Sequence, residues 1–224
     1  MAFLYLLEDF YCFFDIMQYC QRLRSPYLRN NGKPLNSMES LETLFRSFET
    51  GIRSAKALKP KEYLKSIGLE YSDLRIGFNS GQFHHRKEQQ VKDQLEELGL
   101  LTKSDAPVRD DTMTAYTVFG RYGLIFPLLD KDNTIVNFFA LRFDLDEQKQ
   151  EYLNSEGIYP AYPHPLTKKV YLAPTVIDCA SLMQSKVLDQ REAVMALHDG
   201  ELLEQHLEVI KSLYELEEII IFKR

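Results

Sequence analysis

Apolar residues recur with two different periods along the chain, and the period changes near residue 107. Up to residue 101, apolar positions return every three or four residues, which predicts amphipathic helices. These helices are expected at residues 1–20, 37–52, 60–67 and 84–101. Turn residues separate them, and Gly68 is placed to end the third helix.

Beyond residue 107, β-branched and aromatic residues dominate and the runs become shorter. Three runs, at residues 115–119, 122–129 and 134–143, are separated by turn residues and predict an antiparallel meander. Near the C-terminus, strands alternate with helices, which predicts a parallel sheet. The expected strands are 170–172, 193–197 and 218–222, and the expected helices are 176–183 and 202–214. The predicted fold class is therefore α+β: a helical N-terminal region, an antiparallel meander and a partial α/β module.

The first predicted helix, residues 1–20, is rich in Phe, Tyr and Leu. It carries three carboxylates and lacks a basic stretch before its apolar run, so neither a membrane span nor a secretory signal is expected. The favoured interpretation is a helix that packs on the body of the protein. A membrane-surface helix or an oligomer contact remains the alternative.

Composition adds limits on the class of protein. With 224 residues, 45% of them hydrophobic and 12% aromatic, the chain can bury a core and is not disordered as a whole. Three cysteines are too few for a disulfide framework or a four-cysteine zinc site, and this favours a reducing, cytoplasmic location. A net charge of −6 argues mildly against a surface coated with nucleic-acid-binding charge.

The charge is unevenly distributed. Residues 22–65 hold ten basic and four acidic residues, whereas residues 143–224 hold eight basic and fifteen acidic ones. This asymmetry indicates two functional halves, or else ordinary scatter over solvated surfaces.

Candidate chemistry is sparse. The sequence has neither of the usual glycine-rich phosphate-binding loops. His84 and His85 would diverge on a helix, and Cys12 and Cys20 have no histidine nearby, so no zinc is expected. The pair His198-Asp199 follows a predicted strand at its carboxyl end, where α/β sheets bind ligands, although a polar loop is the alternative.

Several short motifs resemble those of bacterial-type DNA primases. Residues 151–155 read Glu-Tyr-Leu-Asn-Ser, similar to the Lys-Tyr-Leu-Asn-Ser element of that family. Residues 121–128 resemble its strand Arg-x-x-x-hydrophobic-Phe-Pro-Ile, and residues 63–77 resemble the opening Tyr-Leu … Gly-Leu … Ile-Gly stretch. Residues 76–85 are most similar to primase-like proteins of conjugative and mobilisable elements.

This resemblance extends from about residue 61 to the C-terminus and implies three parts. Residues 1–58 form a helical N-terminal region of unknown role, and residues 59–165 resemble the N-terminal subdomain of the primase core. Residues 166–224 resemble a truncated toprim module, the metal-binding α/β fold of primases and topoisomerases. The family's N-terminal Cys/His zinc module has no counterpart in the sequence.

The resemblance also implies which residues hold template and nucleotide. Arginine binds phosphate with planar, paired donors, tyrosine stacks on bases and asparagine hydrogen-bonds sugar or phosphate. The predicted nucleic-acid-contacting residues are Arg121, Arg142, Tyr152 and Asn154, with Lys168 and Lys169 as weaker candidates. The alternative roles are plain packing for Tyr152 and, for Arg142, an ion pair with Asp144 or Asp146.

The catalytic elements of toprim are where the sequence departs from the family. The resemblance implies Mg²⁺ held by carboxylates, but Pro174 occupies the position of the family's Glu. The strand-like run 218–222 precedes the position of an Asp-x-Asp pair, and the sequence ends at Arg224. Asp178 remains as a weak metal candidate, and its alternative role is a carboxylate that stabilises a helix N-terminus.

Three hypotheses follow. The favoured one is a primase-related protein that binds single-stranded DNA or primer–template and whose catalysis is incomplete in this chain. The second is an active primer polymerase fragment that uses nucleoside triphosphates and acidic residues beyond position 224. The third is a non-catalytic module that binds a replicative helicase or another protein. None of the three involves a membrane.

Overall fold

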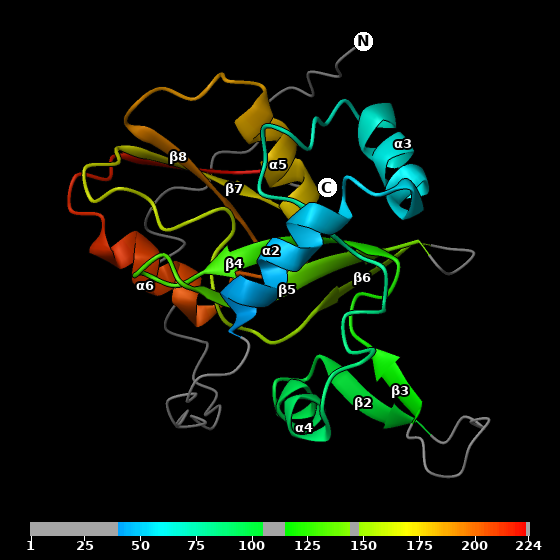
Figure 1. Ribbon diagram of the computed structural model, residues 1–224. Coiled ribbons are helices and arrows are strands. Elements are labelled where there is room, and N and C mark those ends of the chain that lie inside the picture. The colour runs from blue at the N-terminus through cyan, green and yellow to red at the C-terminus, as the bar shows by residue number, and fades with distance from the viewer. Residues whose placement is uncertain (1–39, 105–114, 144–147, 223–224) are drawn as a thin grey trace.

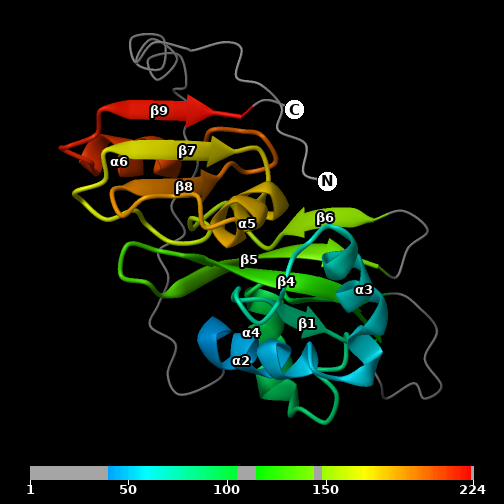
Figure 2. The same cartoon turned by 90° about the horizontal axis from the view of Figure 1, so that it is seen from above.

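The computed structural model describes residues 40–104, 115–143 and 148–222. These residues form a layered α+β structure, in which a parallel sheet, an antiparallel sheet and an N-terminal helix follow one another (Figures 1 and 2). The predicted fold class is confirmed. The expected helix at residues 1–20, with Cys12 and Cys20, lies outside the described residues.

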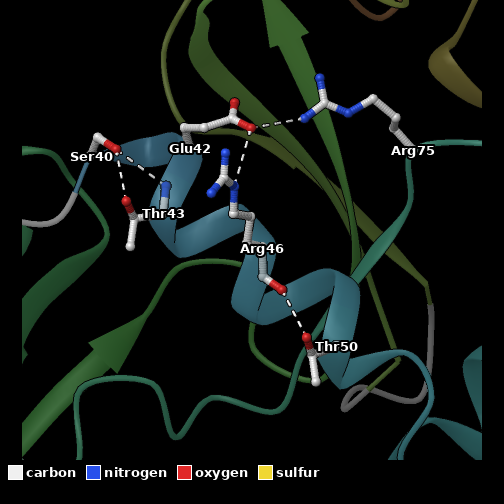
Figure 3. A network of polar contacts seen from close by, with 6 residues as sticks. All are labelled: Ser40, Glu42, Thr43, Arg46, Thr50 and Arg75. Carbon is white, nitrogen blue, oxygen red and sulfur yellow. Dashed lines mark hydrogen bonds and ion pairs between the residues drawn. The ribbon is translucent and has the colours of Figure 1, made fainter.

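The N-terminal layer is helical, as predicted. Helix α2 (Leu41–Gly51) begins at Ser40, whose hydroxyl accepts a hydrogen bond from the backbone N–H of Thr43 at 3.2 Å (Figure 3). The short helix η1 (Ala55–Ala57) leads into α3 (Leu58–Ser66), and Gly68 takes a left-handed φ of 77° just past its end. Across the described part of the chain, no helix has both the length and the hydrophobicity that crossing a bilayer requires.

The antiparallel sheet is covered on both faces. Its strand order is β1-β4-β5-β6, and the strands are β1 (Gly77–Asn79), β4 (Gly123–Leu129), β5 (Ile135–Arg142) and β6 (Lys149–Tyr152). Every residue of β4 is buried, because alternate side chains enter two different cores. Phe126 and Phe139 face α5, whereas Ile125 and Phe138 face α2.

Helix α2 lies close on β1 because glycine removes a side chain from the contact. A Cβ placed on Gly77 would lie 2.5 Å from the Cβ of Phe48, which no ordinary contact allows. Phe48 is 3% exposed and packs edge-to-face on Phe138. This contact fixes the helix against the middle of the sheet.

One predicted helix is wrong in its bounds. Residues 83–86 form a turn, and the helix in this region is α4 (Gln89–Glu97), after which Gly99 takes a φ of 76°. The chain then enters β2 (Leu101–Ser104), which pairs with β3 (Ala115–Val118). The strand predicted at 115–119 therefore exists, but it belongs to this separate hairpin and not to the meander. The helical spacing of leucines continued across Gly99 and concealed the change to β structure.

The C-terminal part is a parallel sheet, as predicted. Its order is β8-β7-β9, and the strands are β7 (Lys169–Ala173), β8 (Glu192–Ala196) and β9 (Glu218–Ile221). Helix α5 (Val176–Gln184) packs between this sheet and the antiparallel one, whereas α6 (Glu204–Ser212) covers the opposite face (Figure 2). Crossovers on opposite faces leave the carboxyl ends of the strands as the edge where such folds bind ligands.

Candidate nucleic-acid interface

A sharp turn before β4 presents two side chains to solvent. Tyr122 takes a φ of 50° there, and its side chain is 36% exposed. The guanidinium carbon of the exposed Arg121 lies 5.5 Å from the centre of that ring, a cation–π arrangement. The turn thus offers a phosphate-binding group beside an aromatic surface.

Lys56 extends this positive charge from η1. Its Nζ donates a hydrogen bond to the side-chain oxygen of Gln82 at 2.7 Å. Next to Gln82, Gly81 packs against Arg121 so closely that a Cβ there would lie 2.9 Å from the arginine Cγ. Lys56 and Arg121 therefore both contact the loop that carries Gly81 and Gln82.

Lys59 reaches the same turn from α3. Its Nζ donates to the carbonyl oxygen of Phe143 at 3.2 Å, and the N–H of Phe143 donates to the carbonyl oxygen of Tyr122 at 3.1 Å. The acceptors for both lysines are neutral, so these contacts leave their positive charge uncompensated. We call this set the basic surface: Lys56, Lys59, Arg121 and Tyr122.

Arg142 supports the turn from inside. Its guanidinium lies 3.6 Å from one oxygen of Glu151, and the other oxygen of Glu151 accepts the N–H of Gly120 at 2.6 Å. The two side chains are only 15% and 20% exposed. Glu151 thereby links Arg142 to the residue that precedes Arg121. The partners expected as alternatives lie outside the described residues, namely Asp144 and Asp146.

Tyr152 lies on the other face of the antiparallel sheet. It pairs with Phe139, which is three residues from Arg142, and side chains an odd number apart point to opposite faces. The ring of Tyr152 stacks on His198, with centroids 3.5 Å apart and planes at 27°, and also contacts Phe139. Burial lowers the pKa of His198, which favours the neutral ring in this stack. A base that stacks on Tyr152 would compete with His198.

The side chain of Asn154 is engaged at both ends within the chain. Its Nδ2 donates to the carbonyl oxygen of Val136 at 2.9 Å, and its Oδ1 accepts the N–H of Glu156 at 2.8 Å. His198 Nε2 lies 3.3 Å from the Asn154 carbonyl oxygen. Tyr152 and Asn154 therefore form the joint between the antiparallel sheet and the turn after β8.

Asn137 organises this joint, although nothing in the sequence analysis singled it out. It is 0% exposed, and its Nδ2 donates to the carbonyl oxygens of Asn154 and Glu156 at 2.8 and 2.7 Å. Its Oδ1 accepts the N–H groups of Phe138 and Asn154 at 2.7 and 3.0 Å. The signal available in the sequence was a single amide within the apolar run of β5.

Lys168 and Lys169 lie elsewhere, at the amino ends of the parallel strands. Lys168 pairs with Glu217, and Lys169 lies 2.8 Å from Glu218 and 3.6 Å from Glu192. The hydrogen bond to Glu218 raises the pKa of Lys169. The structure thus does not bring these two lysines together with Arg121 and Arg142.

The other edge of the parallel sheet is formed by the carboxyl ends of its strands. The toprim resemblance implies catalytic carboxylates at this edge. Pro174 directly follows β7, and its carbonyl oxygen accepts the N–H of Gly200 at 2.9 Å. Asp178 accepts the Thr175 hydroxyl at 2.6 Å and sits in the first turn of α5, which is its predicted structural alternative. Among the described residues, no three potential ligands lie together. The described residues at this edge therefore form no cluster of side-chain ligands that could hold Mg²⁺ by itself.

The turn after β8 is a tight hairpin, which matches the polar-loop alternative for His198-Asp199. Asp199 and Gly200 have φ values of 55° and 85°, and His198 and Glu201 exchange backbone hydrogen bonds of 3.1 Å. The turn orients His198 toward Tyr152.

His84 and His85 lie in a turn, not on a helix. Their ring centroids are 4.5 Å apart with nearly perpendicular planes, and Tyr116 packs on His84. Burial, followed by the neighbouring charges of His85 and Lys92, lowers the pKa of His84 to about 4. The two histidine rings therefore contact each other, and His84 packs against Tyr116 of the β2–β3 hairpin.

Comparison with known proteins identifies the fold. The DnaG primase catalytic domain bound to ssDNA matches with a TM-score of 0.63 and 15% identity, over 80% of this chain and 58% of that one. A DNA primase domain from Pseudomonas aeruginosa matches with a TM-score of 0.64 and 17% identity, over 80% and 59% of the two chains. The RNA polymerase domain of Mycobacterium tuberculosis DnaG, in complex with double-stranded DNA, gives 0.60 and 15%, over 80% and 61%.

These likenesses place the chain in a structural class, the fold of the bacterial primase catalytic core. The chain spans less than two thirds of each of those structures. No protein-family model matches the sequence, and no curated protein sequence matches it either.

Proposed function

We propose that the chain is a primase-related protein that binds single-stranded DNA or primer–template through the basic surface. The observation that carries this proposal is the set of cations whose partners are neutral, beside the exposed ring of Tyr122. A DNA strand supplies phosphates for the cations and bases for the ring. Because the chain shares its fold with primase cores, nucleic acid is the polyanion that we expect it to bind.

The predicted residues take different roles in this proposal. Arg121 contacts phosphate directly, whereas Arg142 acts through Glu151 by holding the turn that carries Arg121. Tyr152 and Asn154 stay predicted contacts for a nucleotide, which reaches them when the His198 contact opens. Lys168 and Lys169 stay weaker candidates, because each must first leave a carboxylate.

We further propose that primer synthesis is incomplete in this chain. Pro174 offers no ligand at the end of β7, and Asp178 is engaged with Thr175. A template-dependent synthesis assay with Mg²⁺ or Mn²⁺ and nucleoside triphosphates tests this, and we expect no product. Product that Asp178→Ala abolishes would establish the alternative, an active polymerase fragment.

The binding proposal is tested by titrating a single-stranded oligonucleotide at about 50 mM and about 200 mM salt. Arg121→Ala is expected to weaken binding about tenfold at low salt and to lower the salt slope by about 0.7. The matched control is Arg191→Ala, an exposed arginine that pairs with Glu215 at 2.7 Å in the parallel module. Absence of binding by the natural chain at low salt would overturn the proposal and favour the protein-interaction module.

Other partners stay predictions. Nucleoside triphosphates and a replicative helicase are implied by the resemblance, as is the link to conjugative and mobilisable elements from residues 76–85. A pull-down with a replicative helicase, using the Arg121→Ala chain alongside the natural one, separates protein binding from DNA binding.

A further inference from the structure

A cavity runs along the end of α2 and shares no residue with the basic surface. Its volume is about 630 Å³, within the range of small-molecule sites. One wall comes from Arg46, Glu49 and Arg53, and the other from Tyr71, Ser72 and Leu74. We call this cavity the α2 groove.

The two arginines of the groove are available to an anion. Arg53 is exposed and has no ion-pair partner in the described part of the chain. Arg46 Nε lies 3.8 Å from Glu42, and its side chain is 74% exposed, so this pair contributes little. Glu42 has a closer partner in Arg75 at 3.3 Å (Figure 3). Arg46 can therefore turn to a ligand while Glu42 stays paired.

The rest of the groove adds an aromatic and a carboxylate side chain. Ile52 and Ile76 also line it, but each is only 2% exposed and presents little surface to a ligand. Tyr71 and Leu74 also line the groove, and both are half-buried side chains that pack against the core containing Ile52 and Ile76. Aromatic rings in such positions stack on nucleobases. Glu49 adds a carboxylate that can accept hydrogen bonds from sugar hydroxyls or base amines.

We propose that the α2 groove binds a nucleotide, with its phosphates on Arg46 and Arg53 and its base against Tyr71. Guanidinium groups bind phosphate oxygens in pairs, and a tyrosine ring can stack on the base. The nucleotide is either free in solution or one unit of a nucleic-acid strand, and both sources share this chemistry.

The proposal is tested by calorimetric titration of the full chain with ADP and, separately, with pyrophosphate. ADP is expected to bind, and Arg53→Ala and Tyr71→Leu are each expected to weaken it about tenfold. Pyrophosphate should bind more weakly than ADP and should not respond to Tyr71→Leu. Arg191→Ala, an exposed arginine that pairs with Glu215 far from the groove in sequence, is the matched control and should leave ADP affinity unchanged. Because Arg53 is exposed, its replacement leaves the fold intact.

Two results would overturn the proposal: no ADP binding up to about 1 mM, or binding that Arg53→Ala leaves unchanged while Arg121→Ala removes it. The source is separated by a thymidine oligonucleotide. If the groove takes a unit of a strand, Arg53→Ala also weakens oligonucleotide binding. If it takes free nucleotide, Arg53→Ala affects ADP alone. Loss of oligonucleotide binding in Arg121→Ala with ADP binding retained would keep this site separate from the proposed DNA surface.

Discussion

Lysines in two parts of the molecule differ in the groups that accept their hydrogen bonds. Lys56 and Lys59 of the basic surface donate to an amide oxygen and a backbone carbonyl oxygen. Lys168 and Lys169 at the amino ends of the parallel strands pair with glutamates. A neutral acceptor orients an ammonium group without cancelling its charge, whereas a carboxylate cancels it. Only the first arrangement leaves a field that attracts a polyanion.

This comparison changes the meaning of the charge counts. The chain carries a net charge of −6, yet the acidic excess of residues 143–224 is partly used to pair the lysines and the arginine of the parallel module. The basic excess of residues 22–65 includes Lys56 and Lys59. Net charge is therefore a poor guide here, because what matters is which cations lack a carboxylate.

The largest expected effect comes from disrupting the joint between the antiparallel sheet and the turn after β8. Asn137→Ala removes four hydrogen bonds from a fully buried site. The carbonyl oxygen of Glu156 and the N–H groups of Phe138 and Asn154 lose this partner, whereas the Asn154 carbonyl oxygen keeps its contact with His198. We expect the free energy of unfolding in urea to fall by about 4 kcal/mol.

The matched control is Gln90→Ala, an exposed amide of α4, which should change stability by less than about 0.5 kcal/mol. A near-neutral Asn137→Ala would show that the joint does not depend on this amide.

Most of the fold could be predicted from the sequence, because apolar periodicity is local. The helices α2, α3, α5 and α6 and all three parallel strands lie where the pattern placed them. Apart from the helix predicted at 84–101, whose leucine spacing continued across Gly99, the failures are cases in which distant residues decide. Strand β1 has three residues and exists because β4 pairs with it. The strand β3 was found, but nothing local shows that Leu101 pairs with Val118.

The candidate site was predictable only in part. Motif likeness selected Arg121 and Arg142, which Glu151 connects. Motif likeness could not show that Tyr152 and Arg142 point to opposite faces of the sheet. That depends on how the residues of β5 and β6 pair with each other. Lys56 and Lys59 were missed as site residues, since their neighbours Gln82 and Phe143 are remote in sequence.

A smaller, pH-dependent effect on the free energy of unfolding is expected from His206, in helix α6 beside the parallel sheet. His206 is 1% exposed; its Nδ1 accepts the N–H of Leu203, and its Nε2 donates to the carbonyl oxygen of Ala196, both at 3.0 Å. Burial lowers the pKa of His206 to about 4, below the value of about 6.5 in the unfolded chain. The stabilisation from the neutral ring is therefore complete above pH 6.5 and declines as pH falls to 4, by up to about 3 kcal/mol.

The measurement is the free energy of unfolding at pH 7 and at pH 4.5 for the natural chain and for His206→Gln. The variant should lose less stability on acidification than the natural chain. His84 and His198 titrate in both proteins, so their contributions cancel in the difference. Equal losses in the two proteins would place the acid sensitivity outside the parallel module.

The smallest effect tests the comparison of the two lysine sets directly. Lys56→Ala is expected to weaken single-stranded DNA binding about threefold at low salt, because it removes one phosphate contact and no internal ion pair. Lys168→Ala should weaken it less, since Glu217 already compensates that charge, and should lower stability by less than about 1 kcal/mol. Raising the salt concentration should shrink the difference between Lys56→Ala and the natural chain, because salt weakens the extra lysine–phosphate contact that only the natural chain makes. If Lys168→Ala weakens DNA binding as much as Lys56→Ala does, then DNA displaces Glu217, and pairing with a carboxylate does not keep a lysine from the interface.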